Sequence, residues 1–132
     1  MIFTNIVPRV SETDGVGHIN NVFVPIWFEA GRREIFRIFS PNLDFVNWKL
    51  ALVKVTVEYV DQLYLAENVE IRTGIQKVGN SSFNIKEEIY QTDRLCARGE
   101  AIYVNYNFKE KKSEPISTEI RDKLQSIKFK EN

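Results

Sequence analysis

The spacing of apolar residues predicts one long helix early in the chain. From about residue 21 to 39, apolar residues recur every three to five positions, which is typical of a helix. We expect this helix to be largely buried, because apolar side chains cover most of its circumference. Asn20 or Asn21 is the expected N-cap. The expected stripe contains Phe23, Ile26, Trp27, Ala30, Ile35 and Ile38, widened by Val24, Phe28 and Phe39.

The apolar period then changes to two, which indicates strands. Alternation predicts strands at about 51–59, 68–78, 82–92 and 95–108, with turns at 78–81 and 92–94. An extended segment at 2–10 precedes the helix, and a short helix is expected from Ser117 to Ile127. In the last long strand, the small residues Ala97, Gly99 and Ala101 share a face that could let a helix approach closely.

These elements predict an α+β fold. Consecutive strands joined by hairpin-length turns form an antiparallel sheet, and the buried helix must lie across one of its faces. We expect about five strands wrapped around one long buried helix, with a short C-terminal helix. A chain of 132 residues fits a single domain, residues 1–132.

Composition narrows the classes of partner. Eighteen basic and 18 acidic residues cancel, which argues against a general nucleic-acid or anionic-membrane binder. The single cysteine, Cys96, excludes an internal disulfide and a cysteine-based zinc site, and it fits a reducing cytoplasm. We expect no signal peptide and no membrane span. The two Trp, five Tyr and nine Phe suggest a tightly filled core or an apolar surface covered by a partner.

The loop before the long helix carries the candidate chemistry. Asp14 lies in a glycine-rich segment near the expected helix start, where free N–H groups can polarise a carbonyl and stabilise an oxyanion. Asp14 could act as a general base or attack directly, while His18 and Asn20 offer hydrogen bonds. This arrangement suits acyl transfer or hydrolysis. Alternatively, Asp14 only caps the helix or forms a turn with Gly15.

Two other features are expected to be structural. Glu87 and Glu88 are adjacent carboxylates, but strand alternation puts them on opposite faces, so we expect both to be solvated. Cys96 has no neighbour in the sequence that would activate its thiol.

The loop and helix resemble the hot-dog-fold thioesterases of the 4-hydroxybenzoyl-CoA thioesterase type and their acyl-carrier-protein relatives. In that family the loop runs Asp-x-Asp-x-x-Gly, often followed by His-Val-Asn-Asn, and the helix often carries Phe-Glu-x-Ala-Arg. The resemblance covers about residues 7–108. The matching segments here are Glu12-Thr-Asp14-Gly-Val-Gly17-His18-Ile-Asn20-Asn21, Phe28-Glu29-Ala-Gly-Arg32, Val57-Glu-Tyr59, Gly79-Asn-Ser81-Ser82-Phe83 and Gly99-Glu-Ala101.

The resemblance implies hydrolysis of an acyl thioester carried by coenzyme A (CoA) or acyl-carrier protein. It implies a homodimer or homotetramer with active sites at the dimer interface, and no metal or cofactor beyond the CoA or phosphopantetheine of the substrate. Asp14 would be the catalytic base or nucleophile, assisted by His18 and Asn20. The N–H groups of Gly17, His18 and Ile19 would polarise the carbonyl. The expected substrate contacts are Asn21, Phe23, Trp27, Tyr59, Gly79, Asn80, Ser81 and Ser82.

Departures from the family pattern leave alternatives open. Glu12 and Gly31 replace an aspartate and an alanine of the family pattern. The turn at 79–81 is neutral, whereas some CoA-using relatives carry basic residues there, so a carrier-protein substrate is plausible. A non-catalytic acyl- or ligand-binding protein of the same fold is the main alternative. A dehydratase or hydratase is less favoured, because the histidine of those enzymes is followed closely by Phe and prolines.

Overall fold

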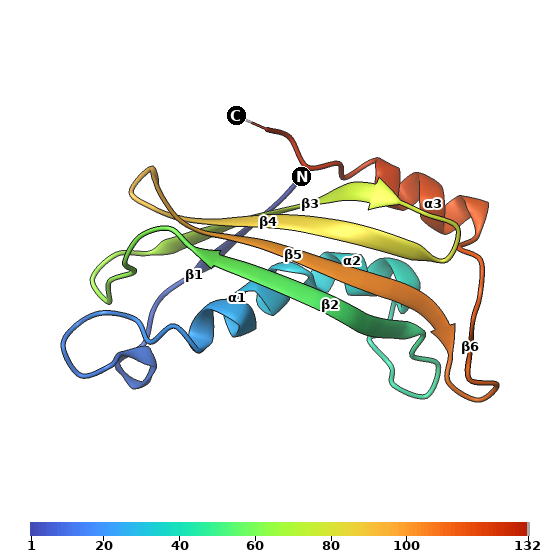
Figure 1. The fold of residues 1–132 in the computed structure, drawn as a ribbon, viewed down its shortest axis with the longest axis horizontal. Coiled ribbons are helices and arrows are strands. Elements are labelled where there is room, and N and C mark those ends of the chain that lie inside the picture. The colour runs from blue at the N-terminus through green and yellow to red at the C-terminus, as the bar shows by residue number, and fades with distance from the viewer. Residues whose placement is uncertain (132) are drawn as a thin grey trace.

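The structure, a computed structural model, describes residues 1–131 as a curled antiparallel sheet with helices against its concave face (Figure 1). Neighbouring strands follow the order β1-β3-β4-β5-β2, with β6 beside β5. The expected α+β fold and C-terminal helix are confirmed. The strands are β1 (Ile2–Ile6), β2 (Leu50–Tyr59), β3 (Val69–Val78), β4 (Ser82–Gln91), β5 (Arg94–Asn107) and β6 (Lys112–Ser113), and the helices are α1 (Phe23–Gly31), α2 (Arg33–Phe39) and α3 (Thr118–Gln125).

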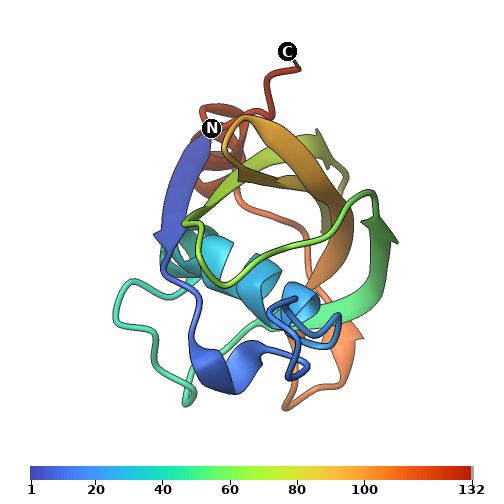
Figure 2. The ribbon, with the colours of Figure 1, turned by 90° about the vertical axis from the view of Figure 1, so that its left-hand side faces the viewer.

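The sheet curls around α1, as the end-on view in Figure 2 shows. The small-residue face of β5 permits this close packing, as the sequence indicates. A Cβ atom on Gly99 would lie only 2.8 Å from the Phe28 ring of α1, and Ala97 and Ala101 are fully buried beside it. The helix therefore lies against the middle of the sheet. No helix among residues 1–131 is long and apolar enough to cross a membrane.

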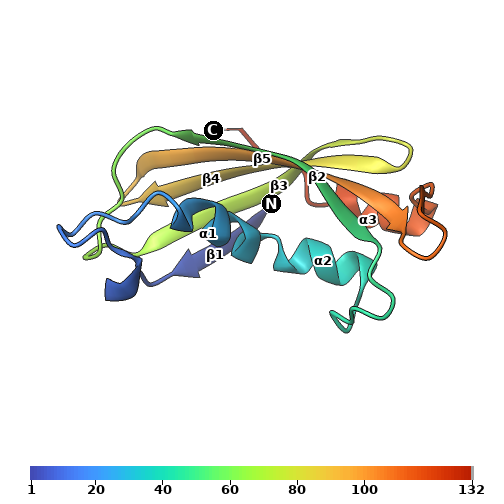
Figure 3. The ribbon, with the colours of Figure 1, turned by 60° about the horizontal axis from the view of Figure 1, so that its bottom comes forward.

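The prediction of a single helix over residues 21–39 is wrong in one respect, because the helix is interrupted at Arg32. The Arg32 N–H donates to the carbonyl of Glu29, and Arg32 separates α1 from α2 with φ −91° and ψ −1°. Figure 3 shows α1 and α2 following one another along the sheet, with α3 at the far end. The interruption places the Arg32 side chain beneath the helix, where it is buried against the sheet.

The start and the faces of α1 also differ from the prediction. Val22, not an asparagine, is the N-cap residue, and the Asn20 side chain accepts the Val22 N–H instead. Ile26 is 58% exposed and Ala30 is also exposed, so this side of α1 does not face the sheet. The spacing of these two residues fits the apolar stripe, but spacing alone does not show which face of a helix the sheet covers.

A buried ion pair joins the helix to the sheet. Arg32 Nε lies 2.7 Å from Glu87 Oε1 on β4, and Thr73 on β3 donates to Glu87 Oε2 at 2.8 Å. Arg32 also donates to the Tyr103 hydroxyl at 3.2 Å. The expectation of a solvated Glu87 is therefore wrong, since its side chain is fully buried. Glu88 is on the opposite face as predicted, but it is also largely buried.

This pair predicts a pH dependence of stability. Burial raises the pKa of Glu87 from 4.5 to about 7, despite the opposing effect of Arg32. Between these values the folded protein retains a proton that the unfolded chain has released. We therefore expect the free energy of unfolding to fall by about 3 kcal/mol as the pH rises from about 4.5 to about 7.

Urea unfolding at a series of pH values measures this slope. The double variant Arg32→Met/Glu87→Met removes both charges together and is expected to lack this part of the pH dependence. The single variant Glu87→Gln imitates the protonated carboxyl and has no proton to lose, so it should also lack this part of the pH dependence. A slope that is identical in the wild type and the double variant would contradict the prediction.

Candidate active site

Asp14 lies in a tight hairpin, which we call the Asp14 loop (residues 13–19). Thr13 and Ile19 pair as an antiparallel bridge, and the Asp14 N–H donates to the His18 carbonyl at 2.9 Å. Gly15 and Gly17 have φ values of +92° and +90°, a conformation that favours glycine. The loop lies at one end of the sheet, just before α1 (Figure 1). The glycines that the sequence places there are therefore needed to close the hairpin.

The Asp14 carboxylate is exposed, and one of its oxygens is fixed. Asp14 Oδ1 accepts the Val16 N–H at 3.1 Å, while no hydrogen bond to Oδ2 is found among residues 1–131. The His18 carbonyl points toward Asp14, because it accepts the Asp14 N–H. In an extended residue the N–H and the C=O point to the same side. The His18 N–H thus points toward the backbone of Asp14, in the same hairpin that carries the exposed carboxylate.

The three proposed carbonyl-polarising amides differ in availability. The Ile19 N–H already donates to the Leu63 carbonyl at 2.8 Å, and the Asn20 N–H donates to the Glu12 carbonyl at 2.8 Å. Within residues 1–131, no acceptor is found for the N–H groups of Gly17 and His18. Helix α1 begins only at Phe23, so these two amides belong to the hairpin and not to the first turn of the helix.

The buried carboxylate of Glu12 holds the chain in place just before the Asp14 loop. Glu12 accepts the Arg9 backbone N–H at 2.7 Å and the Trp27 indole N–H at 2.9 Å. Burial opposes charge on Glu12, but these bonds and the Arg9 guanidinium hold the pKa of Glu12 below its usual value. Glu12 is therefore a structural anchor for the loop. Trp27, an expected substrate contact, lies in the core with its indole N–H occupied.

Several other expected site residues do lie beside the Asp14 loop. The Tyr59 hydroxyl donates to the Asn21 carbonyl at 3.1 Å, which joins the end of β2 to the segment just before α1. Asn20 and Asn21 are exposed, and Phe23 is half-buried against the core. The His18 ring packs edge-on against Tyr64, with 5.2 Å between ring centroids. Tyr64 lies in the loop between β2 and β3, and sequence reasoning assigned it no role.

The turn from Gly79 to Ser82 is not part of this cluster. It joins β3 to β4 at the opposite end of the sheet from the Asp14 loop (Figure 1). Its carbonyls accept bonds from the second half of the chain: Arg121 donates to Gly79, Ile116 to Asn80, and Asn105 to Ser81. A single chain therefore does not bring Asn80, Ser81 or Ser82 to Asp14.

An open groove of about 830 Å³ runs between the outer side of the helices and the start of β2. Apolar and aromatic residues dominate its lining, and Glu29 and Arg33 add two charges. Trp48, which the sequence places in a loop without a periodic pattern and which could line an acyl pocket, is part of this lining. The lining residues are Ile26, Glu29, Ala30, Arg33, Phe36, Leu43, Phe45, Trp48, Leu50, Leu52 and Tyr103.

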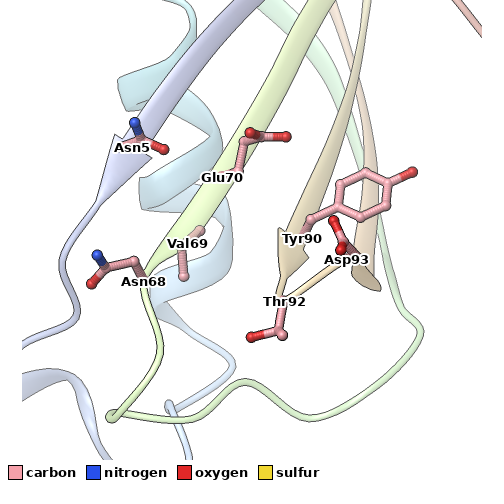
Figure 4. Close-up of a pocket in the computed structure, with 7 residues that line it drawn as sticks. All are labelled: Asn5, Asn68, Val69, Glu70, Tyr90, Thr92 and Asp93. Carbon is pink, nitrogen blue, oxygen red and sulfur yellow. The ribbon is translucent and has the colours of Figure 1, made fainter.

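A smaller hollow of about 170 Å³ lies across β3 and β4, near the turn that joins β4 to β5. Figure 4 shows Glu70, Tyr90 and Asp93 around it. Its lining includes two carboxylates and no basic side chain, so it does not suit the phosphates of CoA. The groove is therefore the better candidate for a bound ligand.

Solved structures resemble the chain along nearly its whole length. A predicted thioesterase from Bacillus stearothermophilus is 49% identical, with a TM-score of 0.95 over 99% of this chain and 98% of that one. A thioesterase complexed with coenzyme A and Zn from Thermus thermophilus is 19% identical, with a TM-score of 0.83 over 95% and 92%. A 1,4-dihydroxy-2-naphthoyl-CoA thioesterase from Synechocystis is 17% identical, with a TM-score of 0.80 over 94% and 95%. The last two similarities show the fold alone.

The family comparison covers the Asp14 loop, both helices of the concave face and the sheet from β2 to β5. The model of the Thioesterase-like superfamily matches residues 8–124. No curated protein matches the chain. The family and the similar Bacillus protein support thioester hydrolysis. On this match, the chain belongs to the Thioesterase-like superfamily.

Proposed function

We propose that the protein hydrolyses an acyl thioester, carried by CoA or by acyl-carrier protein, to a free acid and a thiol. The observation that carries this proposal is the Asp14 loop. It presents an exposed carboxylate, fixed through Oδ1, in the same hairpin as the N–H groups of Gly17 and His18, which have no acceptor within residues 1–131. Thioester hydrolysis needs a base and oxyanion donors, and here one rigid segment holds both.

The reaction follows from these groups. As general base, Asp14 takes a proton from water while the water oxygen attacks the thioester carbonyl carbon. The carbonyl oxygen gains negative charge, which the N–H groups of Gly17 and His18 stabilise. The C–S bond then breaks, and the thiolate leaves and takes up a proton. As nucleophile, an Asp14 oxygen would instead attack the carbonyl carbon, and the C–S bond would break to release the thiolate. Water would then cleave the resulting mixed anhydride, which releases the acid and regenerates Asp14. The side chains of His18 and Asn20 lie beside this position and would orient the water or the substrate.

We also propose that two copies pair through β2. This strand is ten residues long and lies at an edge of the sheet, where β5 is its one paired neighbour among residues 1–131. Val55 and Val57 lie on the concave side, opposite Ala101 and Gly99, and Val55 is 41% exposed. A long, apolar, exposed edge strand is a template for pairing with another strand. Antiparallel pairing of two copies would extend the sheet across both subunits.

Such pairing would complete the active site. Around a two-fold axis, the Tyr59 end of β2 lies beside the Leu50 end of the partner strand. Tyr59 is bonded to Asn21 near the Asp14 loop, whereas Leu50 lines the groove. The groove of one subunit would then open toward the Asp14 loop of the other. Its volume of about 830 Å³ and aromatic lining suit an acyl group, so we assign the acyl chain to it.

The variant Asp14→Asn tests the reaction. An asparagine keeps the oxygen that accepts the Val16 N–H but cannot act as base or nucleophile, so kcat should fall by about 10²- to 10⁴-fold. The measurement is a hydrolysis assay over acyl chains of increasing length on both CoA and acyl-carrier protein. Asp44→Asn is a matched control, because Asp44 accepts the Val46 N–H in the same way at 2.7 Å. Its kcat should equal that of the wild type.

Undiminished hydrolysis by Asp14→Asn would refute the role of Asp14. A wild-type protein that binds one of these thioesters without hydrolysing any would favour the non-catalytic alternative.

The variant Val55→Asp tests the pairing. A carboxylate on the concave edge would be desolvated between the two β2 strands, so we expect a dimer in the wild type and a monomer with little activity in the variant. Sedimentation velocity gives the mass of each. Val7→Asp is the control, since Val7 is 71% exposed but lies outside β2. A wild-type monomer, or equal dissociation of both variants, would contradict the proposal.

A further inference from the structure

We infer that Gln91 is a positioning residue for the Asp14 loop, although it lies outside the loop and its side-chain hydrogen bonds within residues 1–131 go to Tyr64 and Glu67. It acts through residues 62–67, which we call the clamp segment, in the connection between β2 and β3. The kinetic part of this inference rests on the proposed function. The structural part, that Gln91 sets the geometry around His18, does not.

Gln91 uses its whole side-chain amide to hold the clamp segment. Its Oε1 accepts the Tyr64 N–H at 2.9 Å, and its Nε2 donates to the carbonyls of Tyr64 and Glu67 at 2.8 and 2.9 Å. The side chain is fully buried at the end of β4. Buried polar groups that lose their partners are costly, so these three bonds fix the backbone on both sides of Leu65.

The clamp segment in turn holds the backbone on each side of His18. The Ile19 N–H donates to the Leu63 carbonyl at 2.8 Å, and the Leu65 N–H donates to the Gly17 carbonyl at 3.1 Å. These two bonds make the antiparallel bridge between His18 and Tyr64. Because both bonds point toward the clamp segment, the N–H of His18 must point the other way, to the side where its carbonyl meets Asp14. A shift of the clamp segment would therefore turn the His18 N–H relative to the Asp14 carboxylate.

Other contacts of the clamp segment are weaker supports. Arg94 donates to the Gln62 carbonyl at 2.7 Å, and the Thr92 hydroxyl donates to the Glu67 carboxylate at 2.7 Å. Both bonds are exposed to solvent, where polar and ionic contacts contribute little. The Arg94 guanidinium lies 5.4 Å from the centre of the Tyr64 ring. The Leu63 side chain also anchors the segment, because it is buried in the hydrophobic core. Gln91 is thus the buried polar group that fixes the backbone at Tyr64 and Glu67.

The variant Gln91→Met tests this inference, because methionine keeps the length of the side chain and removes all three bonds. The chain has a single histidine, so ¹³C,¹⁵N-histidine labelling gives one imidazole signal set that reports on His18 alone. We expect these signals to shift or broaden in Gln91→Met, while the indole signal of the remote Trp48 stays in place. We expect kcat to fall roughly 10- to 100-fold with KM changed less than about threefold, because the reacting groups are misplaced while the acyl site is intact.

Asn105→Leu is the matched control. Asn105 is also a buried amide, and its Nδ2 donates to the carbonyls of Glu114 and Pro115, both at 3.2 Å, far from the Asp14 loop. This variant should lower Tm as Gln91→Met does, yet leave the His18 signals unchanged. Gln91→Asn, which keeps the amide but is one methylene shorter, is a milder second variant should Gln91→Met fail to fold. An intermediate change in the His18 signals is expected for it.

The two proposals fail in different ways. Unchanged His18 signals and kcat in both Gln91 variants would overturn the inference and leave the proposed function standing. Equal shifts of the His18 signals in Asn105→Leu would also overturn it, since they would show a general loosening of the fold. A wild type without activity on any thioester, combined with His18 shifts confined to the Gln91 variants, would refute the proposed function and support the positioning role.

Discussion

The contact between the helix and the sheet at Gly31 and Arg32 constrains the rest of the structure. A Cβ atom on Gly31 would lie 2.7 Å from the Thr73 hydroxyl and 3.0 Å from Glu87 Oε2, so no larger residue fits without displacement. Directly after it, Arg32 leaves the helical path and meets Glu87 at 2.7 Å. Desolvating this pair is unfavourable, and only close geometry with the additional bonds from Thr73 and Tyr103 offsets that cost. The pair thereby fixes where α1 lies along the sheet.

Once α1 is fixed, the Asp14 loop has little freedom. Trp27, one turn before Gly31, holds Glu12 through its indole N–H, and Glu12 lies just before the loop. The clamp segment holds the other side of the loop through Leu63 and Leu65. Loops carry reactive groups effectively when a rigid scaffold positions them. Here the exposed carboxylate of Asp14 lies between an anchor from the helix and an anchor from the sheet.

The sequence was sufficient to predict elements whose pattern is local. The strands β2 to β5 begin and end within one or two residues of the alternating segments, because one face of each strand packs against the core. The Asp14 loop was also identified, since its glycines and acidic residue are adjacent in the chain. The interruption at Arg32, the buried Glu87 and the role of Gln91 could not be predicted. Each depends on a partner from a distant segment, and no local pattern distinguishes a buried glutamate or glutamine from a solvated one.

Within a single chain, the candidate reactive groups and the aromatic part of the groove lie at two different places. The Asp14 loop and Tyr59 lie at one end of β2, while the aromatic part of the groove, with Phe45 and Trp48, lies at the other. Within one chain these ends are separated by the length of a ten-residue strand, about 33 Å. An antiparallel copy of β2 removes that separation without moving any residue, because it reverses the strand. In the proposed dimer, the excess of aromatic residues in a short chain of zero net charge would have a physical reason: part of the apolar surface would lie between the subunits and around the acyl group.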